Sequence, residues 1–199
     1  MSTMKNDARS IMLVGVGGQG TILASKILTT GLIAAGYDVK MSEIHGMSQR
    51  GGSVSTQVRF GTKVYSPIIG RGQADILVAF ETMEAMRYLP DLKPDGKIVV
   101  NDYKMPSMPI LAGDCEYPDG IISELRSKAE TLVLDASAIA CGQGNPRGMN
   151  VVLLGALIRS MGLQDIDWAT AVRACMKSKL VDVNLRCLEA GMRAAEDAL

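Results

Sequence analysis

The stretch Ile11-Met-Leu-Val-Gly15-Val-Gly17-Gly18-Gln19-Gly20 joins an apolar run to four glycines within six positions. Apolar residues then return at helical spacing, at Ile22, Leu23, Ile27, Leu28, Leu32 and Ile33, which predicts strand, tight turn and helix in that order. The pattern Gly15-x-Gly17-x-x-Gly20 matches the dinucleotide-binding fingerprint. Backbone N–H groups at such a helix N-terminus favour an anion. Two interpretations stay open: the turn binds a phosphate or carboxylate, or it only lets strand and helix pack closely.

Composition bounds the rest of the chain. With 199 residues, of which 47% are hydrophobic, we expect a single domain over 1–199 whose core needs no disulfide or metal; residues 1–9 are expected to form a flexible N-terminus. Basic and acidic residues balance to a net charge of zero without a basic patch, so no nucleic-acid partner is expected. No apolar run approaches the roughly 20 residues that span a bilayer, and the first ten residues lack a signal-peptide core. We therefore expect no membrane association and a cytoplasmic location.

The cysteines and the lone histidine bear on metal chemistry. Cys115, Cys141, Cys175 and Cys187 lie at least twelve residues apart, and His45 is the one histidine. Zinc and iron–sulfur sites usually have closely spaced ligands, so we expect no metal on this chain and predict buried thiols.

The remaining pattern predicts an α/β fold. A strand over 39–43 should pair in parallel with the first strand and complete a right-handed βαβ unit. Alternating residues over 54–60, a turn at 61–62 and a strand over 63–69 predict a half-exposed antiparallel hairpin. Further strands are predicted over 74–80, 97–101 and 131–135, and helices over 81–89, 121–129, 149–161 and the C-terminal segment. The predicted class is a Rossmann-like, largely parallel sheet with flanking helices plus an added antiparallel hairpin layer.

One loop has neither helical nor strand periodicity. It is Ser42-Glu-Ile-His-Gly-Met-Ser-Gln-Arg-Gly-Gly-Ser53, and a polar, glycine-rich stretch after a strand is typical of a site or an interface. We interpret it as a partner-interface loop whose candidates are Ser42, Glu43, His45, Gly46, Met47, Ser48, Gln49, Arg50, Gly51 and Gly52. His45 and Arg50 are candidates for catalysis, because an imidazole titrates near neutral pH and a guanidinium binds carboxylates or phosphates bidentately. An interface without chemistry is the alternative.

Gly17-Gly-Gln-Gly20 and the loop over 42–54 together resemble the gamma family of 2-oxoacid:ferredoxin oxidoreductases, and within it the beta subunits of the indolepyruvate enzymes. Shorter pieces match in order: Gln57-Val-Arg59, Ser66-Pro-Ile-Ile69, Gly72-Gln-Ala-Asp75, Phe80-Glu81, Glu84-Ala85 with Arg87, Val99-Val-Asn101 and Asn150-Val-Val-Leu-Leu-Gly-Ala156. The resemblance runs from about residue 10 to the C-terminal helix, and it implies the fold of the gamma domain of pyruvate:ferredoxin oxidoreductase.

The family's enzymes decarboxylate a 2-oxo acid, transfer the acyl group to coenzyme A and pass electrons to ferredoxin. The resemblance implies that chemistry for a complex. This chain lacks the Gly-Asp-Gly motif of thiamine diphosphate sites and lacks closely spaced cysteines. Thiamine diphosphate, Mg and [4Fe-4S] clusters are therefore expected on a larger partner subunit, with ferredoxin reached through the complex. The chain itself is expected to be an accessory subunit, inactive alone, of an enzyme for indolepyruvate or other aryl pyruvates; a homodimer of the isolated chain is left open.

The expected ligand of the glycine loop is coenzyme A or another anion, held by Gly15, Gly17, Gly18, Gln19 and Gly20. The rival hypothesis is a free-standing dinucleotide-binding oxidoreductase, since Glu43 lies 23 residues after Gly20, near where an acidic group holds a ribose 2′-OH. The predicted hairpin interrupts the strand order that this rival requires. A non-catalytic scaffold subunit is the third hypothesis.

Overall fold

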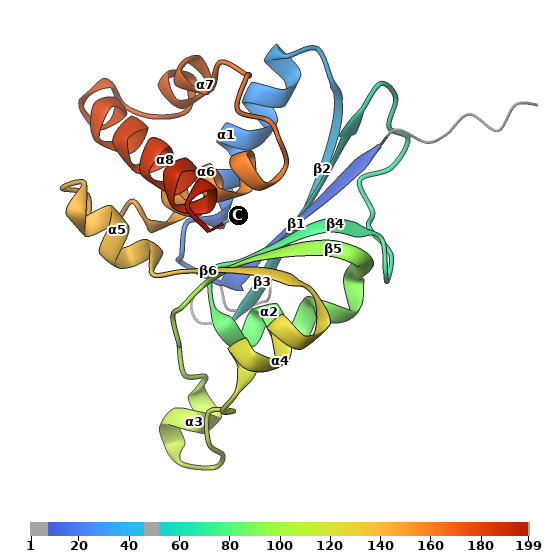
Figure 1. Cartoon of the computed structure of the whole chain (residues 1–199), viewed down its shortest axis with the longest axis vertical. Helices are drawn as coiled ribbons and strands as arrows, with labels where there is room; N and C mark the ends of the chain where they lie inside the picture. The colour runs from blue at the N-terminus through green and yellow to red at the C-terminus, as the bar shows by residue number, and fades with distance from the viewer. Residues whose placement is uncertain (1–7, 46–51, 199) are drawn as a thin grey trace, which may run out of the picture.

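A computed structural model describes residues 8–45 and 52–198 as a mixed α/β fold around a six-stranded sheet (Figure 1). The strands are β1 (Arg9–Val16), β2 (Asp38–His45), β3 (Ser53–Gly61), β4 (Ala74–Ala79), β5 (Leu92–Asn101) and β6 (Glu130–Leu134). The helices are α1 (Thr21–Ala34), α2 (Thr82–Tyr88), α3 (Met108–Ala112), α4 (Ile121–Lys128), α5 (Ala136–Gly142), α6 (Met149–Ser160), α7 (Trp168–Cys175) and α8 (Val181–Glu196), with 3-10 turns η1 (Leu89–Asp91) and η2 (Ser178–Leu180). None of the described helices is long and apolar enough to cross a membrane.

The sheet order is β2-β3-β1-β4-β5-β6. Parallel pairings join β1 to β4, β4 to β5 and β5 to β6, which confirms a largely parallel sheet. The predicted parallel pairing of β1 with β2 is wrong, because β3 lies between them and is antiparallel to both. Val58 of β3, fully buried, has Ile11 opposite it on one side and Met41 on the other. A short connection from β2 favours its antiparallel neighbour, whereas a parallel neighbour needs a long crossover.

The predicted hairpin is right about antiparallel pairing and wrong about its second strand and its exposure. Residues 62–73 are irregular and cover β3. The Gln57 side chain accepts a hydrogen bond from the Ile69 N–H at 2.7 Å, and the Arg59 guanidinium donates to the Ser66 carbonyl at 3.2 Å. Both faces of β3 are therefore mostly buried, and the antiparallel pair is β2 with β3 within the sheet instead of a separate layer.

Each face of the sheet has its own hydrophobic core. One core joins α1, α6, α7 and α8, and the other joins α2 and α4 (Figure 1). Helix α6 is buried on nearly every side. It crosses α8 closely at two glycines: a Cβ on Gly155 would lie 2.1 Å from the Leu188 carbonyl oxygen, and one on Gly191 would lie 1.9 Å from that of Val152. Helices α3, α5 and α7 were not predicted.

Candidate functional site

The chain leaves the carboxyl ends of β1 and β4 in opposite directions. After β1 it runs through α1 to β2 on one side, and after β4 it runs through α2 to β5 on the other. Such a switch point leaves a crevice outside the strand ends, where open α/β sheets bind ligands. An open cleft of about 730 Å³ lies there, formed by the glycine loop, the segment after β5, the start of α5 and the second glycine-rich loop. Its lining residues are Gly17, Gly18, Gln19, Gly20, Tyr103, Met105, Ser137, Pro146, Arg147, Met149 and Asn150.

The glycine loop enters α1 through two left-handed residues. Gly18 has φ +103° and Gly20, the N-cap of α1, has φ +84°, which an L side chain rarely adopts. Within the described residues no side chain caps α1. The N–H of Gly17 donates to the Gly52 carbonyl at 2.8 Å and that of Gln19 donates to the Val16 carbonyl at 3.2 Å. Two of the predicted anion donors are thus engaged internally, whereas the N–H groups of Gly18 and Gly20 donate to no described residue.

The Gln19 side chain ties the loop down, although it was predicted as a possible ligand contact. Its Oε1 accepts a hydrogen bond from the Val16 N–H at 2.7 Å, and its Nε2 donates to the Phe80 carbonyl at 3.1 Å. A Cβ on Gly15 would lie 2.7 Å from that Oε1 and 2.9 Å from the Phe80 Cβ. Gly15 is therefore required for close packing, while Gly18, whose Cβ would meet nothing within 4 Å, borders open space.

Several residues that line the cleft were not predicted from the sequence. Tyr103 is 43% exposed, and Arg147 is exposed within the glycine-rich loop at 142–148. The Asn150 side chain donates to the Gly20 carbonyl at 3.1 Å, which fixes α6 against the start of α1. A cation within a second glycine-rich loop was the available signal for Arg147. With two amides that donate to no described residue, a guanidinium and an aromatic ring, the cleft has the groups that bind a phosphorylated, ring-containing molecule.

The partner-interface loop predicted over 42–52 contacts the glycine loop at its end, where the Gly17 N–H donates to the Gly52 carbonyl. Ser42 and Glu43 lie on β2, and the Ser25 hydroxyl of α1 donates to the Glu43 carboxylate at 3.2 Å. β3 separates these residues from β1. His45 ends β2 opposite Val54. The side chain of His45 and the residues Gly46, Met47, Ser48, Gln49, Arg50 and Gly51 lie outside the described part of the chain.

Two buried carboxylates at the start of α2, Glu81 as its N-cap and Glu84 in its first turn, hold the surrounding segments. Glu81, 0% exposed, accepts hydrogen bonds from the Met105 N–H at 3.1 Å, the Glu84 N–H at 3.0 Å and the Tyr117 hydroxyl. Burial and the neighbouring Glu81 carboxylate raise the pKa of Tyr117 above its ordinary value. Glu84, also buried, accepts from the Ser53 hydroxyl and from Arg87. The same turn therefore fixes the segment after β5 and the residue that follows the 42–52 loop.

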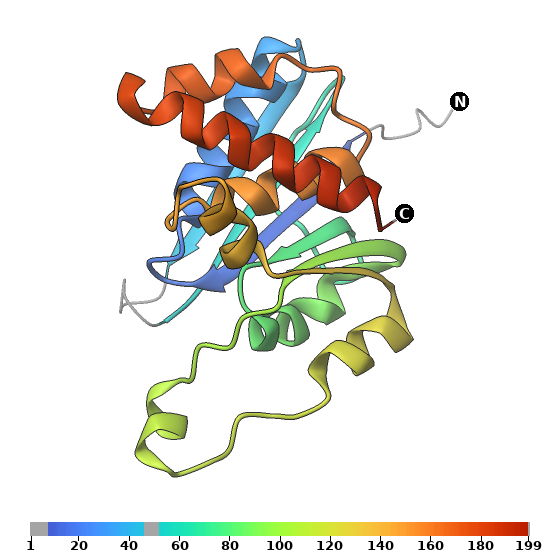
Figure 2. The same ribbon diagram turned by 60° about the vertical axis from the view of Figure 1, so that its left-hand side comes forward.

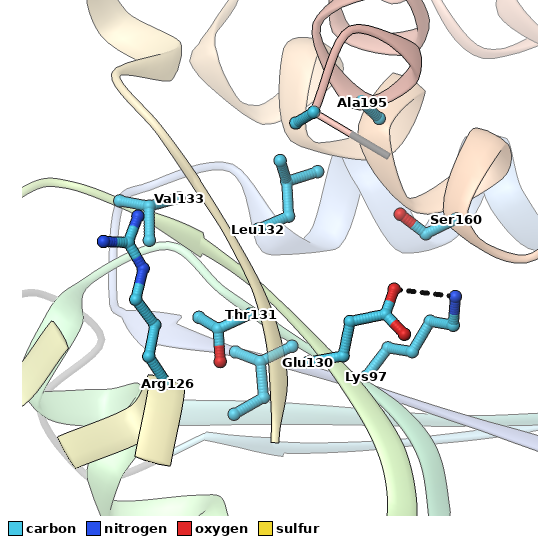
Figure 3. Close-up of a pocket in the computed structure, with 10 residues that line it drawn as sticks. Lys97, Arg126, Glu130, Thr131, Leu132, Val133, Ser160 and Ala195 are labelled. Carbon is cyan, nitrogen blue, oxygen red and sulfur yellow. Dashed lines mark hydrogen bonds and ion pairs between the residues drawn. The ribbon is translucent and has the colours of Figure 1, made fainter. Parts of the chain in front are cut away.

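A smaller cavity of about 190 Å³ lies at the edge strand β6 (Figure 3). Its lining includes Arg126 and the ion pair of Lys97 and Glu130, whose ammonium and carboxylate lie 2.8 Å apart. The switch-point cleft combines a cation with the N-terminus of α1 and is the stronger candidate for an anionic ligand.

The cysteine prediction holds for one residue of four. Cys187 is buried, Cys175 is half-buried, and Cys115 and Cys141 are exposed. Burial is the main cause that raises the pKa of the Cys187 thiol. Within residues 8–45 and 52–198, no group of three or more His, Cys, Asp or Glu residues is placed to hold a metal ion.

Comparison with known proteins gives consistent matches. The family model described as pyruvate ferredoxin/flavodoxin oxidoreductase matches residues 10–194. The chain is 37% identical over 198 residues to the indolepyruvate oxidoreductase subunit IorB of Thermococcus kodakarensis, covering 96% of this chain and 97% of that protein.

Two solved structures share the fold. The gamma subunit of a keto/oxoacid ferredoxin oxidoreductase from Geobacter sulfurreducens matches with a TM-score of 0.71 and 23% identity, over 95% of this chain and 99% of that one. The 2-oxoglutarate:ferredoxin oxidoreductase from Magnetococcus marinus, solved with 2-oxoglutarate, coenzyme A and succinyl-CoA bound, matches with a TM-score of 0.72 and 20% identity, over 98% of this chain and 32% of that one. By the extent of the family match and the identity to a full-length relative, the chain belongs to the pyruvate ferredoxin/flavodoxin oxidoreductase family.

Proposed function

We propose that this chain is the accessory subunit of a 2-oxoacid:ferredoxin oxidoreductase for indolepyruvate or other aryl pyruvates, and that its switch-point cleft binds coenzyme A. The family match and the relative of indolepyruvate-enzyme type, which aligns along nearly its whole length, support the first part. The observation that carries the second part is the cleft itself, where amide donors and a guanidinium converge at a helix N-terminus.

The donor set fits the anionic part of coenzyme A. The N–H groups of Gly18 and Gly20 and the positive end of α1 would face a diphosphate, with the Arg147 guanidinium as its counter-charge. The exposed ring of Tyr103 would stack on the adenine. The 2-oxoglutarate enzyme of the same fold, solved with coenzyme A, gives independent support. When bound, coenzyme A supplies the thiol that accepts the acyl group; the residues of this chain hold and orient it.

We place thiamine diphosphate, Mg and the [4Fe-4S] clusters on the larger partner subunit. Within the described residues this chain offers no cluster of metal ligands, and its sequence has no Gly-Asp-Gly motif. The partner-interface loop over 42–52 would then contact that subunit, because the Gly17–Gly52 hydrogen bond brings its end beside the cleft. Under this proposal His45 and Arg50 approach the acyl acceptor, and ferredoxin is reduced through the complex.

Calorimetric titration of the isolated chain with coenzyme A, NADH and NADPH tests the ligand. We expect saturable binding of coenzyme A and none of the two nicotinamide cofactors. Tight NADH or NADPH binding without coenzyme A binding would favour a free-standing dinucleotide enzyme, and binding of none of the three would favour a scaffold.

Co-expression with the larger subunit tests the assembly. We expect ferredoxin to be reduced by indolepyruvate and coenzyme A only when both chains are mixed. Oxidation of a 2-oxo acid by the isolated chain would overturn the proposal, as would full activity of the larger subunit alone.

A further inference from the structure

The segment over 102–118, here called the arm, projects away from the sheet. It leaves the end of β5, carries α3 at its tip and returns to the start of α4 (Figures 1 and 2). None of the residues of α3 is buried. Met108 is 75% exposed and Leu111 is 66% exposed, so the tip presents two large apolar side chains to solvent. Paired apolar side chains at the end of a projection are typical of a contact with another protein.

The base of the arm is firmly fixed. Met105 lies on the segment that leaves β5, and Tyr117 lies on the segment that returns to α4. The Met105 N–H and the Tyr117 hydroxyl both donate to the carboxylate of Glu81, which is 0% exposed. The Tyr117 hydroxyl also lies 2.6 Å from the Thr82 hydroxyl. One buried carboxylate therefore holds the two ends of the arm together.

The tip is ordered by its own hydrogen bonds. The Leu111 N–H donates to the Ser107 carbonyl at 2.9 Å, and the Asp114 N–H donates to the Pro109 carbonyl at 2.9 Å. Gly113 ends α3 in the left-handed conformation at φ +84°, as helix C-termini commonly do. Because base and tip are both preorganised, the arm would lose little conformational entropy on binding.

We propose that the arm docks into an apolar recess with a basic rim on the larger, cofactor-bearing subunit. This inference rests on the proposed function. Tyr103 and Met105, at the base of the arm, also line the cleft, so a protein that closes over the cleft also meets the arm. The same fold forms only 32% of the longer Magnetococcus marinus chain, so that chain has further parts besides this fold.

The charged residues of the arm indicate which charge the rim of the recess carries. The arm carries Asp102, Asp114 and Glu116, and all three are exposed. Its one basic residue, Lys104, has its ammonium 5.1 Å from the centre of the Tyr117 ring, at the base. Asp102 also lies at the base, directly after β5. The two exposed carboxylates that follow the tip, Asp114 and Glu116, favour a basic surface around the apolar recess.

Binding of the double variant Met108→Asp, Leu111→Asp to the purified larger subunit tests the proposal. We expect its affinity to fall by at least about tenfold, because two apolar anchors become charged. Ile33→Asp is the matched control and should bind as the wild type does. Ile33 is 59% exposed on α1, and α1 lies on the other side of the sheet from α3 (Figure 1). Unfolding midpoints of both variants verify that they fold.

A second measurement needs no disruptive substitution. Cys115 lies on the arm and is exposed, so its alkylation rate should fall when the larger subunit binds; Cys115→Ser assigns the signal. Wild-type affinity of the double variant, or unchanged alkylation of Cys115 in the complex, would overturn the docking inference alone. A double variant that loses only self-association would assign the arm to a second copy and overturn it likewise. Failure of the wild-type chain to bind the larger subunit would overturn the proposed function together with the inference.

Discussion

The side-chain amides of Gln19 and Asn101 meet at one atom, the carbonyl oxygen of Phe80, to which they donate at 3.1 Å and 3.3 Å. Each amide also accepts a hydrogen bond: Gln19 from the Val16 N–H at 2.7 Å, and Asn101 from the Ala136 N–H at 3.0 Å. The ends of β1, β4 and β5 and the start of α5 are thereby fastened to each other. This hydrogen-bond network reaches the cleft through Gln19 and fixes the glycine loop before any ligand binds.

Gln19→Met should destabilise the chain by about 1–3 kcal/mol, because it leaves the Val16 N–H without its side-chain acceptor and removes one donor to Phe80. Urea unfolding measures the loss. Gln164→Met, at an exposed position, is the control and should change the free energy of unfolding little. If Gln19→Met left the free energy of unfolding unchanged, the hydrogen-bond network would not stabilise the loop.

Three glycines with positive φ separate backbone strain from crowding. Gly18→Ala and Gly36→Ala add a Cβ that meets nothing within 4 Å, whereas the Cβ of Gly20→Ala would lie 2.6 Å from the Asn150 Nδ2. The first two should each lose about 1 kcal/mol of unfolding free energy from strain, and Gly20→Ala should lose more. Gly36 ends α1 far from the cleft, so only Gly18→Ala of the strained pair should also weaken coenzyme A binding in calorimetry. Equal binding by both would exclude Gly18 from the site.

Arg147→Gln should weaken coenzyme A binding by about tenfold, the effect of losing one charge-assisted hydrogen bond. In the assembled enzyme this should appear as a raised KM for coenzyme A with kcat unchanged, and raising the salt concentration should shrink the difference from the wild type. Arg173→Gln, on α7 away from the cleft, should leave KM as it is. A changed kcat at constant KM would assign Arg147 a different role.

Local patterns predicted most of the elements, but not helices α3, α5 and α7 or the pairing of β2. The strand, glycine turn and helix at 9–34 depend on neighbours in sequence, and they were predicted correctly. The pairing of β2 depends on β3, which sits between β1 and β2. Residues 63–69 have a strand-like pattern, yet Pro67 disfavours strand pairing. The hydrogen bond that Gln57 accepts from Ile69 and the one that Arg59 donates to Ser66 hold the segment in an irregular path.

The candidate site divides in the same way. The glycine loop has a spacing that can be read from sequence, but Tyr103 and Arg147 reach the cleft only because the strand order continues from β1 through β4 to β5 and β6, which the segments that carry them follow. No sequence motif predicts that the Gln19 side chain bonds to the backbone of Val16 and Phe80. Such residues are defined by three-dimensional neighbours, which a single sequence does not specify.

Gly155→Ala should strongly destabilise the chain, because its Cβ would lie 2.1 Å from the Leu188 carbonyl oxygen in α8. The two helices must separate to admit it, at a cost of about 1–3 kcal/mol or more. Thermal unfolding measures this. Gly162→Ala, just after α6, carries the strain of φ +66° without a neighbour within 4 Å and should lose less. Comparable losses in the two variants would contradict the close helix crossing.

Tyr117 gives the arm a predicted sensitivity to alkaline pH. Burial first, and then the Glu81 carboxylate, raise the pKa of this phenol in the folded chain above its ordinary value of 10.0. A raised folded pKa means that the stabilisation from the neutral phenol is complete below pH 10.0 and is lost as the pH rises through the folded value. Tyr117→Phe should cost about 1 kcal/mol near neutral pH through its lost hydrogen bonds, and the difference from the wild type should narrow above about pH 10.

Urea unfolding from about pH 8 to about pH 11 measures this, and comparing variant with wild type cancels the titration of lysines. Tyr65→Phe is the matched control, since Tyr65 is 89% exposed, and its difference from the wild type should stay flat across the range. The alkylation rate of Cys115 measures the order of the arm. Because Tyr117→Phe removes a hydrogen bond at the base of the arm, it should change the alkylation rate of Cys115 relative to that of Cys141. A Tyr117→Phe difference independent of pH would mean that the phenol and Glu81 are not coupled as their hydrogen bond indicates.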